Sequence, residues 1–343
     1  MKNIKQLLDN NKKIFFIAEA GVNHNGSIKI AKKLVDIAVK SRADAIKFQT
    51  FICDELLTKN AKKMSHQKKS NSKISQFDLL KKLELSQYQL KELQNYCRKK
   101  KIIFFSTAFD NKSLIFLNKI NIPIFKVPSS EINNYPYLKL LASFKKPIIL
   151  STGMSYEKEV KEAIKILVKN GTRKSDIILL HCTSQYPSKF NDLNLNAIKT
   201  LKNKFKCLVG YSDHSPGIIA PIAAVAMGAR VIEKHFTISK KMIGPDHISS
   251  LDPNELKDVI LSIRKLEFSF GNGIKKPTIS ERENRLLGRK SIVAHKDIKI
   301  GERFSEKNIT TKRPGTGISP TNFFTFIGKK SKKNYKKDDF IKN

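Results

Sequence analysis

Two histidines in this sequence each come shortly after an apolar run, and their spacing could place them on neighbouring strands of one sheet. His214 follows the run at residues 208–210, and His235 follows the run at 231–233. Neutral imidazole nitrogens bind divalent metals, with water or substrate oxygens in the remaining positions. Two hydrogen-bonded core histidines would give the same pattern. The spacing alone therefore leaves both a metal site and a structural pair open.

Lysine and hydroxyl side chains occur at the ends of other apolar runs, and their chemistry suits a phosphate group. Thr107, Lys126, Ser129 and Ser151 all lie at such positions. Ammonium and hydroxyl groups donate hydrogen bonds to phosphate oxygens. Buried charges are costly unless they are paired or bound to a ligand, so the repetition of this pattern favours a catalytic site. Further polar residues at run ends are Glu19, Lys47, Gln49, Glu131, His181, Ser184, Tyr186, Ser212, Asp213, Glu233 and Lys234.

These side chains meet only if the fold gathers the run ends, and the order of elements predicts such a fold. Each short apolar run is followed by a stretch with helical periodicity, as in a buried parallel sheet. Eight strands that alternate with helices predict an α/β fold, the (β/α)8 TIM barrel, whose active sites lie at the carboxyl ends of the strands. An open doubly wound sheet is the main alternative, and the lack of a GxGxxG motif after the first run weakens it. The predicted strands are residues 14–18, 44–48, 102–105, 123–127, 147–150, 177–180, 208–210 and 231–233.

Two helices and one long excursion stand out between the strands. Residues 155–170 carry apolar side chains on one helical face, and Ser86 with Gln89 forms a capping box that starts another helix. Residues 52–83 do not alternate in this way, and we predict a mobile surface segment or lid there. Lys62, Lys63, Lys68, Lys69 and Lys73 lie there among Ser and Asn residues.

The pattern changes near residue 276, which predicts a second domain. We assign 1–275 to the barrel, 276–288 to a polar linker, and 289–343 to a small C-terminal domain. In this last part short β-type runs are separated by turn residues, so the domain should be β-rich.

Composition narrows the classes of function. No stretch of 18 or more apolar residues occurs, and the N-terminus lacks the apolar run of a secretion signal, so we expect a cytoplasmic protein without membrane contact. The four cysteines form no CxxC spacing, so they should be reduced and mostly buried.

Lysine and arginine number 66 against 30 acidic residues, a formal charge of +36. The lysines are spread evenly and no nucleic-acid-binding motif is present, so we expect no nucleic acid partner, while a positive field favours anionic substrates.

Ten segments together resemble the N-acetylneuraminate (sialic acid) synthase family, which includes the N,N'-diacetyllegionaminate synthases. The resemblance extends from the first strand nearly to the end of the chain, where it implies a SAF (antifreeze-like) domain. In order along the chain, the segments are AEAGVNHNGS, IKFQTF, FFSTAFD, FKVPSSEINNYPYL, ILSTGM, LLHCTSQYP, GYSDHSPG, IEKHFT, GPDH and KRPGTGISP.

The resemblance implies a reaction. Members of this family condense phosphoenolpyruvate with open-chain N-acetylmannosamine and water, and they release phosphate with C–O cleavage. They require a divalent cation, Mn2+ or Mg2+, and they form domain-swapped homodimers. Carried onto this sequence, the resemblance makes His214 and His235 the metal ligands and Glu19 the residue that orients or deprotonates the water. It implies that phosphoenolpyruvate is held by Lys126, Thr107, Ser129, Ser151, Ser184 and Ser212, and the sugar by Gln49, Glu131, Tyr186, Asp246 and Arg313 of the other subunit.

Alternatives remain at this level. Within the family, the first expectation is N-acetylneuraminate, with N,N'-diacetyllegionaminate or pseudaminate as the alternative product. A Schiff-base aldolase using Lys47 or Lys126 is a second mechanism, and a basic nucleic-acid or carbohydrate-binding protein is the alternative without catalysis. Ala108, Ser130 and Ser184 stand where relatives commonly have other residues, but these departures remove no implied ligand.

Overall fold

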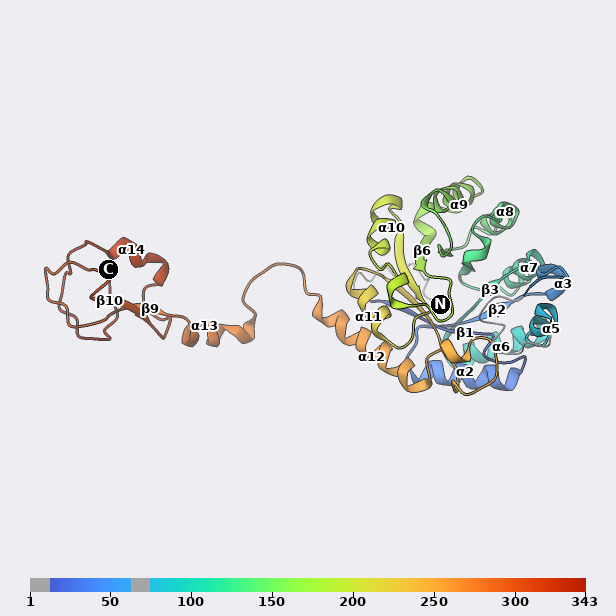
Figure 1. Ribbon diagram of the computed structural model, residues 1–343, viewed down its shortest axis with the longest axis horizontal. Helices are drawn as coiled ribbons and strands as arrows, with labels where there is room; N and C mark the ends of the chain where they lie inside the picture. The colour runs from blue at the N-terminus through green and yellow to red at the C-terminus, as the bar shows by residue number, and fades with distance from the viewer. Residues whose placement is uncertain (1–12, 63–74) are drawn as a thin grey trace. The chain divides into compact units, whose positions relative to one another are not determined.

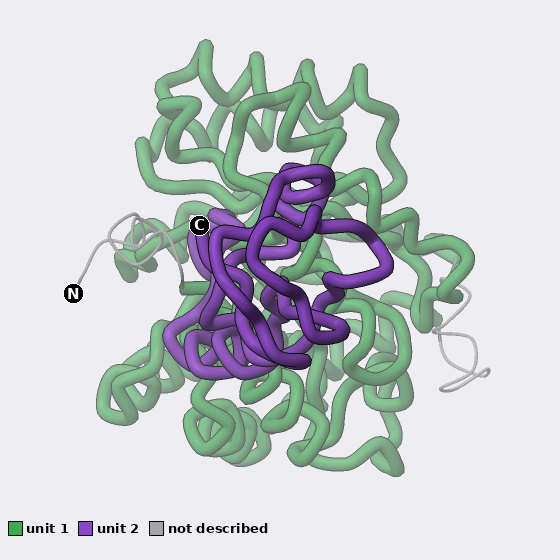
Figure 2. The backbone as a smooth tube through the Cα atoms, turned by 90° about the vertical axis from the view of Figure 1, so that its left-hand side faces the viewer, with its two compact units in different colours: residues 1–270 green, residues 271–343 purple. Residues whose placement is uncertain are grey.

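A computed structural model describes residues 13–62 and 75–343. The chain divides into two compact units, Met1–Phe270 and Gly271–Asn343, which Figure 2 distinguishes by colour. Lys63, Lys68, Lys69 and Lys73 of the predicted lid lie outside the described residues, whereas Lys62 is described and exposed. None of the helices in the described parts of the chain is both long and apolar enough to cross a lipid bilayer.

The first unit is a closed barrel of eight parallel strands in sequence order, which confirms the predicted (β/α)8 fold. Helices surround the strands in Figure 1. The strands are β1 (Phe15–Gly21), β2 (Ala45–Thr50), β3 (Ile103–Ala108), β4 (Phe125–Val127), β5 (Ile148–Ser151), β6 (Ile177–Cys182), β7 (Leu208–Asp213) and β8 (Val231–His235). The helices are α2 (Ile28–Lys40), α3 (Cys53–Leu56), α5 (Gln76–Lys81), α6 (Gln87–Lys99), α7 (Asn111–Lys119), α8 (Tyr135–Ser143), α9 (Glu157–Lys169), α10 (Ala197–Phe205), α11 (Ile219–Ala226) and α12 (Pro253–Ser269).

Most strands extend further at their carboxyl ends than the apolar runs predicted. β7 reaches Asp213 and β8 reaches His235, although the runs stop at residues 210 and 233. The backbone ladder continues there, since Ser212 pairs with Glu233 and Asp213 with Lys234. Strand pairing depends on backbone groups and not on apolar side chains, so polar residues that serve the barrel mouth can end an apolar run while the strand goes on.

Local sequence signals set the helix ends. Ser86 caps α6, and its side chain and that of Gln89 form the predicted capping box. The excursion at 52–83 contains α3 and α5, which pack on a small apolar cluster around Phe51 and Cys53. The described parts of this excursion therefore bury apolar side chains, which an irregular surface segment would not do.

The second unit has its own small core. Strands β9 (Ser291–Ala294) and β10 (Ile309–Lys312) form an antiparallel pair, and single bridges such as Val293 with Phe340 extend the pairing. Helix α13 (Arg282–Gly288) lies within the segment predicted as a linker, and its Leu286 carbonyl accepts a hydrogen bond from Gly315 N at 2.7 Å. A short helix, α14 (Phe323–Phe326), completes the unit. The core side chains are Ile292, Ala294, Ile298, Phe304, Ile309, Phe326, Tyr335 and Ile341.

Candidate active site

A cavity of about 580 Å³ opens at the carboxyl ends of the barrel strands. Parallel strands bring these ends to one side of the barrel, and the residues between strand and helix complete the wall. The structure gathers the predicted site residues of the barrel here. They are Glu19, Gln49, Thr107, Lys126, Ser129, Glu131, Ser151, Ser184, Tyr186, Ser212, His214, His235 and Asp246.

Alternation along the strands decides which polar side chains reach the cavity. On β8, Glu233 and His235 line it, whereas Lys234 between them does not. Ser212 and His214 line it from β7 and the residue after it, whereas Asp213 does not. Successive side chains of a strand point to opposite faces of the sheet. Residues that are equally buried thus belong to two separate environments.

Four buried charged residues at the cavity floor form a balanced group, which we call the mouth cluster: Glu19, Lys47, Lys126 and Glu233. Lys47 Nζ lies 2.9 Å from Glu19 Oε2 and 3.7 Å from Glu233 Oε2. Lys126 Nζ lies 3.5 Å from Glu233 Oε1. From the sequence we predicted no specific role for Glu233, and for Lys47 only a role in the aldolase alternative. Glu233 lies on the inward face of β8 and Lys47 on the inward face of β2, and these positions could have identified both as site residues.

Hydroxyl groups connect to the mouth cluster. Thr107 Oγ1 accepts a hydrogen bond from Lys47 at 2.7 Å, and Ser151 Oγ accepts one from Lys126 at 2.8 Å. Ser212 donates to Glu233 Oε1 at 3.0 Å. These contacts place two ammonium groups and three hydroxyls on one wall, which is the donor set that a phosphate or carboxylate requires.

Gly153 leaves room beside this wall. A side chain there would have its Cβ 2.3 Å from Ser184 Oγ and 2.8 Å from Ser129 Oγ, distances that van der Waals contact forbids. The Gly153 N–H donates to Ser129 Oγ at 3.1 Å. The glycine therefore keeps two cavity hydroxyls close to the backbone, where an anionic ligand could reach all three groups.

Burial and neighbouring charges shift the pKa values of the two carboxyl groups in the mouth cluster in opposite directions. Burial raises the pKa of Glu19 to about 8, because the Lys47 ammonium offsets only part of the desolvation and Glu233 adds to it. Burial would raise the pKa of Glu233 as well, but Lys126 and Lys47 outweigh it and hold that pKa below its usual range. Burial lowers the pKa of Lys126. Two neighbouring carboxyls with separated pKa values suit one proton carrier and one fixed counter-charge.

The two histidines share one wall of the cavity, with ring centroids 5.6 Å apart. His214 Nδ1 lies 2.7 Å from the Thr183 carbonyl, so it carries the proton and leaves Nε2 with its lone pair. Burial lowers the pKa of His214 to about 4, and burial together with His214 and Lys47 lowers that of His235 further below its ordinary value. Both rings are therefore neutral, which is the form that binds a metal.

This donor set fits a divalent cation whose remaining ligands are not protein groups. His235 Nδ1 has no hydrogen-bond partner among the described residues, and the Asp246 carboxylate lies 3.6 Å away. Across the described ranges, no cluster of three or more His, Cys, Asp or Glu side chains surrounds a single position. A cation here would need oxygen atoms from water or substrate, as a catalytic site does.

The predicted sugar ligands of the barrel line the same cavity, and Tyr186 and Asp246 lie beside the imidazoles. The Tyr186 ring lies against His214, with centroids 4.1 Å apart, and burial raises the pKa of its hydroxyl. Burial also raises the pKa of Asp246 to about 6. Glu131 Oε2 accepts from Asn134 at 2.6 Å. Arg313 belongs to the second unit, where it is exposed immediately after β10, and its role stays a prediction.

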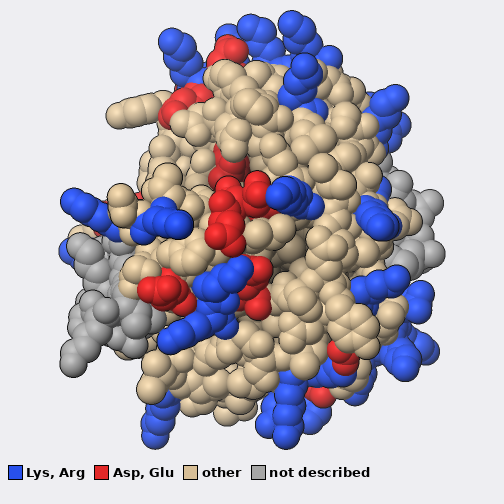
Figure 3. Space-filling view, turned by 90° about the vertical axis from the view of Figure 1, so that its right-hand side faces the viewer, with Lys and Arg blue, Asp and Glu red and all other residues tan. Residues whose placement is uncertain are grey.

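The surface charge is distributed and forms no continuous basic stripe on the face that Figure 3 shows. Many lysine and arginine side chains project around the edge of this face of the barrel unit, and aspartate and glutamate side chains gather near its middle with a few basic side chains beside them. The exposed lysines also pair locally with acids, as Lys112 does with Glu55 at 2.6 Å.

Comparisons with known proteins agree with this geometry. Residues 34–275 match the NeuB family, and residues 289–343 match the SAF domain. The N,N'-diacetyllegionaminic acid synthase of Campylobacter jejuni is 51% identical over 96% of this chain and 99% of that protein. A protein of the same name from Legionella pneumophila is 47% identical over 92% of this chain and 89% of its own. The crystal structure of an N-acetylneuraminic acid synthetase from Leptospira borgpetersenii, in complex with citrate, is 37% identical with a TM-score of 0.72, covering 80% of this chain and 90% of that one.

Proposed function

The chain belongs to the NeuB family, and on that premise we propose that it condenses phosphoenolpyruvate with an N-acetylated hexosamine to make a nine-carbon acid sugar. The observation that carries the proposal is the shared cavity, in which an anion-binding wall lies beside two neutral imidazoles. Phosphoenolpyruvate supplies the anion, and the aldehyde of the open-chain sugar supplies the electrophile.

The proposed product is an N,N'-diacetyllegionaminate-type acid. The relatives with that name are 51% and 47% identical to this chain, against 37% for the N-acetylneuraminic acid synthetase. The alternative product of the sequence analysis is therefore better supported than N-acetylneuraminate, the first expectation. Because phosphoenolpyruvate contains no nitrogen, both acetamido groups of such a product must come from the sugar.

The anion-binding wall accounts for the phosphoenolpyruvate site in this proposal. Lys126 and Lys47 neutralise the phosphate and carboxylate, and the hydroxyls of Thr107, Ser151 and Ser212 orient them. The Ser129 and Ser184 hydroxyls, which lie beside Gly153, complete the set. Glu233 keeps both ammonium groups at the floor of the cavity before substrate arrives, so little reorganisation is needed.

His214 and His235 would hold the divalent cation, Mn2+ or Mg2+. When bound, the cation supplies Lewis-acid polarisation of the sugar aldehyde. The chain itself fixes the two rings: the Thr183 carbonyl orients His214, and Tyr186 packs against both imidazoles. The partner-free Nδ1 of His235 is the second available nitrogen in the described site.

The proposed reaction balances with one water molecule. The methylene carbon of phosphoenolpyruvate forms a bond to the aldehyde carbon, whose oxygen gains a proton. Water then adds to the carbon that carries the phosphate, and the C–O bond to phosphate breaks as the water oxygen becomes the ketone oxygen. Of the two protons that the water loses, one balances the proton gained by the aldehyde oxygen and the other leaves with phosphate. Glu19, with a pKa of about 8, would take the first of these protons in its ionised form, which becomes more populated as the pH rises toward 8.

The remaining residues would bind the sugar. Gln49, Glu131, Tyr186 and Asp246 offer hydrogen-bonding groups above the cavity floor. In a domain-swapped homodimer, Arg313 of the second subunit would approach the N-acetyl region, so a complete site would need two chains.

Phosphate release tests the proposal. The purified protein is given phosphoenolpyruvate with N-acetylmannosamine or with a 2,4-diacetamido hexosamine, with and without Mn2+, and product mass is measured. We expect cation-dependent phosphate release and a larger kcat/KM for the diacetamido sugar. Borohydride with pyruvate should trap no lysine; trapping at Lys47 or Lys126 would favour the aldolase alternative. Absence of phosphate release with both sugars would overturn the proposed function.

A further inference from the structure

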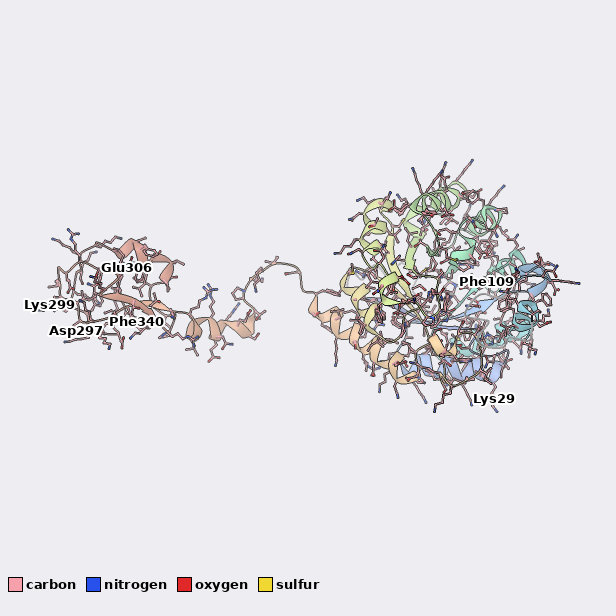
Figure 4. All side chains as sticks on the ribbon, in the orientation of Figure 1. Lys29, Phe109, Asp297, Lys299, Glu306 and Phe340 are labelled. Carbon is pink, nitrogen blue, oxygen red and sulfur yellow. The ribbon has the colours of Figure 1, made fainter. Side chains whose placement is uncertain are left out.

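Apolar side chains surround the outer part of the cavity, although its floor is highly charged. We call four of them the apolar rim: Phe51, Leu57, Leu80 and Phe109. They come from the end of β2, from the residues around α3 and α5, and from the residue after β3. Phe51 and Phe109 meet edge to face, with ring centroids 6.4 Å apart. Figure 4 labels Phe109 on the barrel.

The residues of β2 show how polarity changes with depth. Lys47, Gln49 and Phe51 are alternate residues, and all three line the cavity. They thus form three levels from the floor outward: an ammonium group, a carboxamide and a phenyl ring, each about 6.6 Å further along the strand. The neighbouring strand repeats the trend, since Thr107 lies at the floor and Phe109 at the rim. The Gln49 carboxamide lines the cavity and offers both a donor and an acceptor to a ligand.

The rim side chains are arranged for contact with a small apolar group. Leu57, Leu80 and Phe109 are half-buried, so they are neither core residues nor freely solvated. Leu80 and Phe109 pack on the cluster that also holds Val22 and Cys53, which fixes them from behind. A ligand methyl group would remove their remaining exposed surface from water.

The chemistry of the proposed substrate supplies such a group in one place. The sugar aldehyde must lie at the cavity floor, beside the imidazoles and the anion wall. N-acetylmannosamine already carries an acetamido group on the carbon next to the aldehyde. A second acetamido group must therefore lie further along the chain, and so further from the floor. It combines an amide, which needs a donor and an acceptor, with a methyl group, which needs an apolar contact.

We propose that the apolar rim selects sugars with a second acetamido group: Leu57, Leu80, Phe51 and Phe109 contact its methyl group, while Gln49 pairs with its amide. This inference rests on the proposed function and adds the feature that separates a diacetamido from a monoacetamido sugar. A hydroxyl at the same place would lose the apolar contact, and discrimination by one small apolar group reaches about tenfold or more.

Two matched variants on α5 test the inference. Leu80 and Phe77 are both half-buried and both pack on the same cluster, but only Leu80 lines the cavity. Leu80→Ser and Phe77→Ser are compared with wild type by kcat/KM for the diacetamido hexosamine and for N-acetylmannosamine. Leu80→Ser should lower the ratio of the two values at least about tenfold, whereas Phe77→Ser should keep the wild-type ratio. If Leu80→Ser does not fold, Leu57→Ser, at a rim position outside α5, provides the same measurement.

The outcomes separate the two claims. A rim variant that loses the same factor on both sugars, or a control that changes the ratio as strongly, would overturn the rim assignment and leave the synthase proposal intact. Wild-type protein that turns over neither sugar would remove the proposed function and this inference with it.

Discussion

The mouth cluster and the pair formed by Asp213 and Lys234, which we call the outer pair, are equally buried but differ in their surroundings. In the outer pair, Lys234 Nζ lies 2.5 Å from Asp213 Oδ2 and also contacts the Ser215 carbonyl. Asp213 Oδ1 accepts from the Tyr211 hydroxyl and from Ser215 N, both at 3.0 Å. In the mouth cluster, by contrast, Glu19 Oε1 and Glu233 Oε2 have no hydrogen-bond partner among the described residues.

This difference shows that burial does not identify a functional charge. Both groups come from the same strand ends, and alternation sends one into the cavity and the other behind the strands. The outer pair satisfies its own hydrogen bonds and joins β7 to β8, which is a structural task. In the mouth cluster, carboxylate oxygens without hydrogen bonds and two ammonium groups face a cavity. This arrangement costs free energy unless a ligand supplies the missing hydrogen bonds. The same substitution, made in each group, therefore tests whether the two groups differ in function.

Loss of a metal-binding imidazole should have the largest effect. His214→Ala should lower phosphate release at least about a thousandfold, because the aldehyde loses its polarising group. The free energy of unfolding should change much less than the activity, since the His214 side chain lines a cavity, where it makes one hydrogen bond to the Thr183 carbonyl and ring contacts with Tyr186 and His235. Steady-state phosphate release and urea denaturation measure the two effects. Retained turnover in this variant, or in His235→Ala, would remove the metal assignment.

Lys126→Met should separate activity from stability in the mouth cluster. We expect phosphate release to fall about a hundred- to a thousandfold. The stability loss should be small for a buried pair, because Glu233 keeps Lys47 at 3.7 Å and the Ser212 hydroxyl at 3.0 Å. The KM for phosphoenolpyruvate should rise, and a variant with unchanged KM and kcat would contradict the anion-binding wall.

The same lysine-to-methionine substitution in the outer pair should lower stability strongly and activity only slightly. Lys234→Met leaves the Asp213 carboxylate buried without its cation, which costs about 3–5 kcal/mol of unfolding free energy. Turnover per folded molecule should stay within a few-fold of wild type. Urea denaturation measures the loss, and adding Asp213→Asn to the variant should restore part of it. If Lys234→Met stopped catalysis in fully folded protein, the division between the two groups would be wrong.

Glu19 supplies a pH test with a definite sign. Its folded pKa of about 8 lies above the ordinary 4.5, so folding favours the neutral acid. That contribution is fully present below about pH 4.5 and is lost as the pH rises through 8. Relative to Glu19→Gln, the metal-free wild type should thus lose stability between these limits. Denaturation at several pH values measures the difference, and parallel curves would show that Glu19 is ionised throughout.

The same carboxyl should shape the pH profile of the reaction. If Glu19 takes the proton from water, it must be ionised, so kcat/KM should rise with pH toward 8. Glu19→Gln should lose this limb and about a hundredfold in rate. A profile that keeps the limb in the variant would assign the proton to another group.

The sequence predicted the barrel well because its strands are short apolar runs with helices between them. It underestimated strand length, since the apolar pattern stops where side chains such as Ser212 and His235 begin to serve the cavity. It listed Glu233 and Lys47 at strand ends without recognising their pairing, because β8 and β2 come together on the two sides of β1 only when the barrel closes. The apolar rim was not predicted, since Leu57 and Leu80 lie outside the strands and an apolar residue there resembles ordinary core.

The cysteines repeat the comparison with the smallest expected effect. Cys182 at the end of β6 lines the cavity and lies 3.3 Å from Ser129 Oγ, whereas Cys97 on α6 is buried behind the strands. Burial raises the pKa of Cys97 to about 12, so its reactive thiolate is about a thousandfold scarcer than in a free thiol. With iodoacetamide and mass spectrometry, native protein should be modified at Cys182 before Cys97, and phosphoenolpyruvate should slow only the modification of Cys182. Equal labelling of the two cysteines, unchanged by phosphoenolpyruvate, would mean that the cavity face and the outer face of the barrel are not chemically distinct. The contrast between the mouth cluster and the outer pair depends on that distinction.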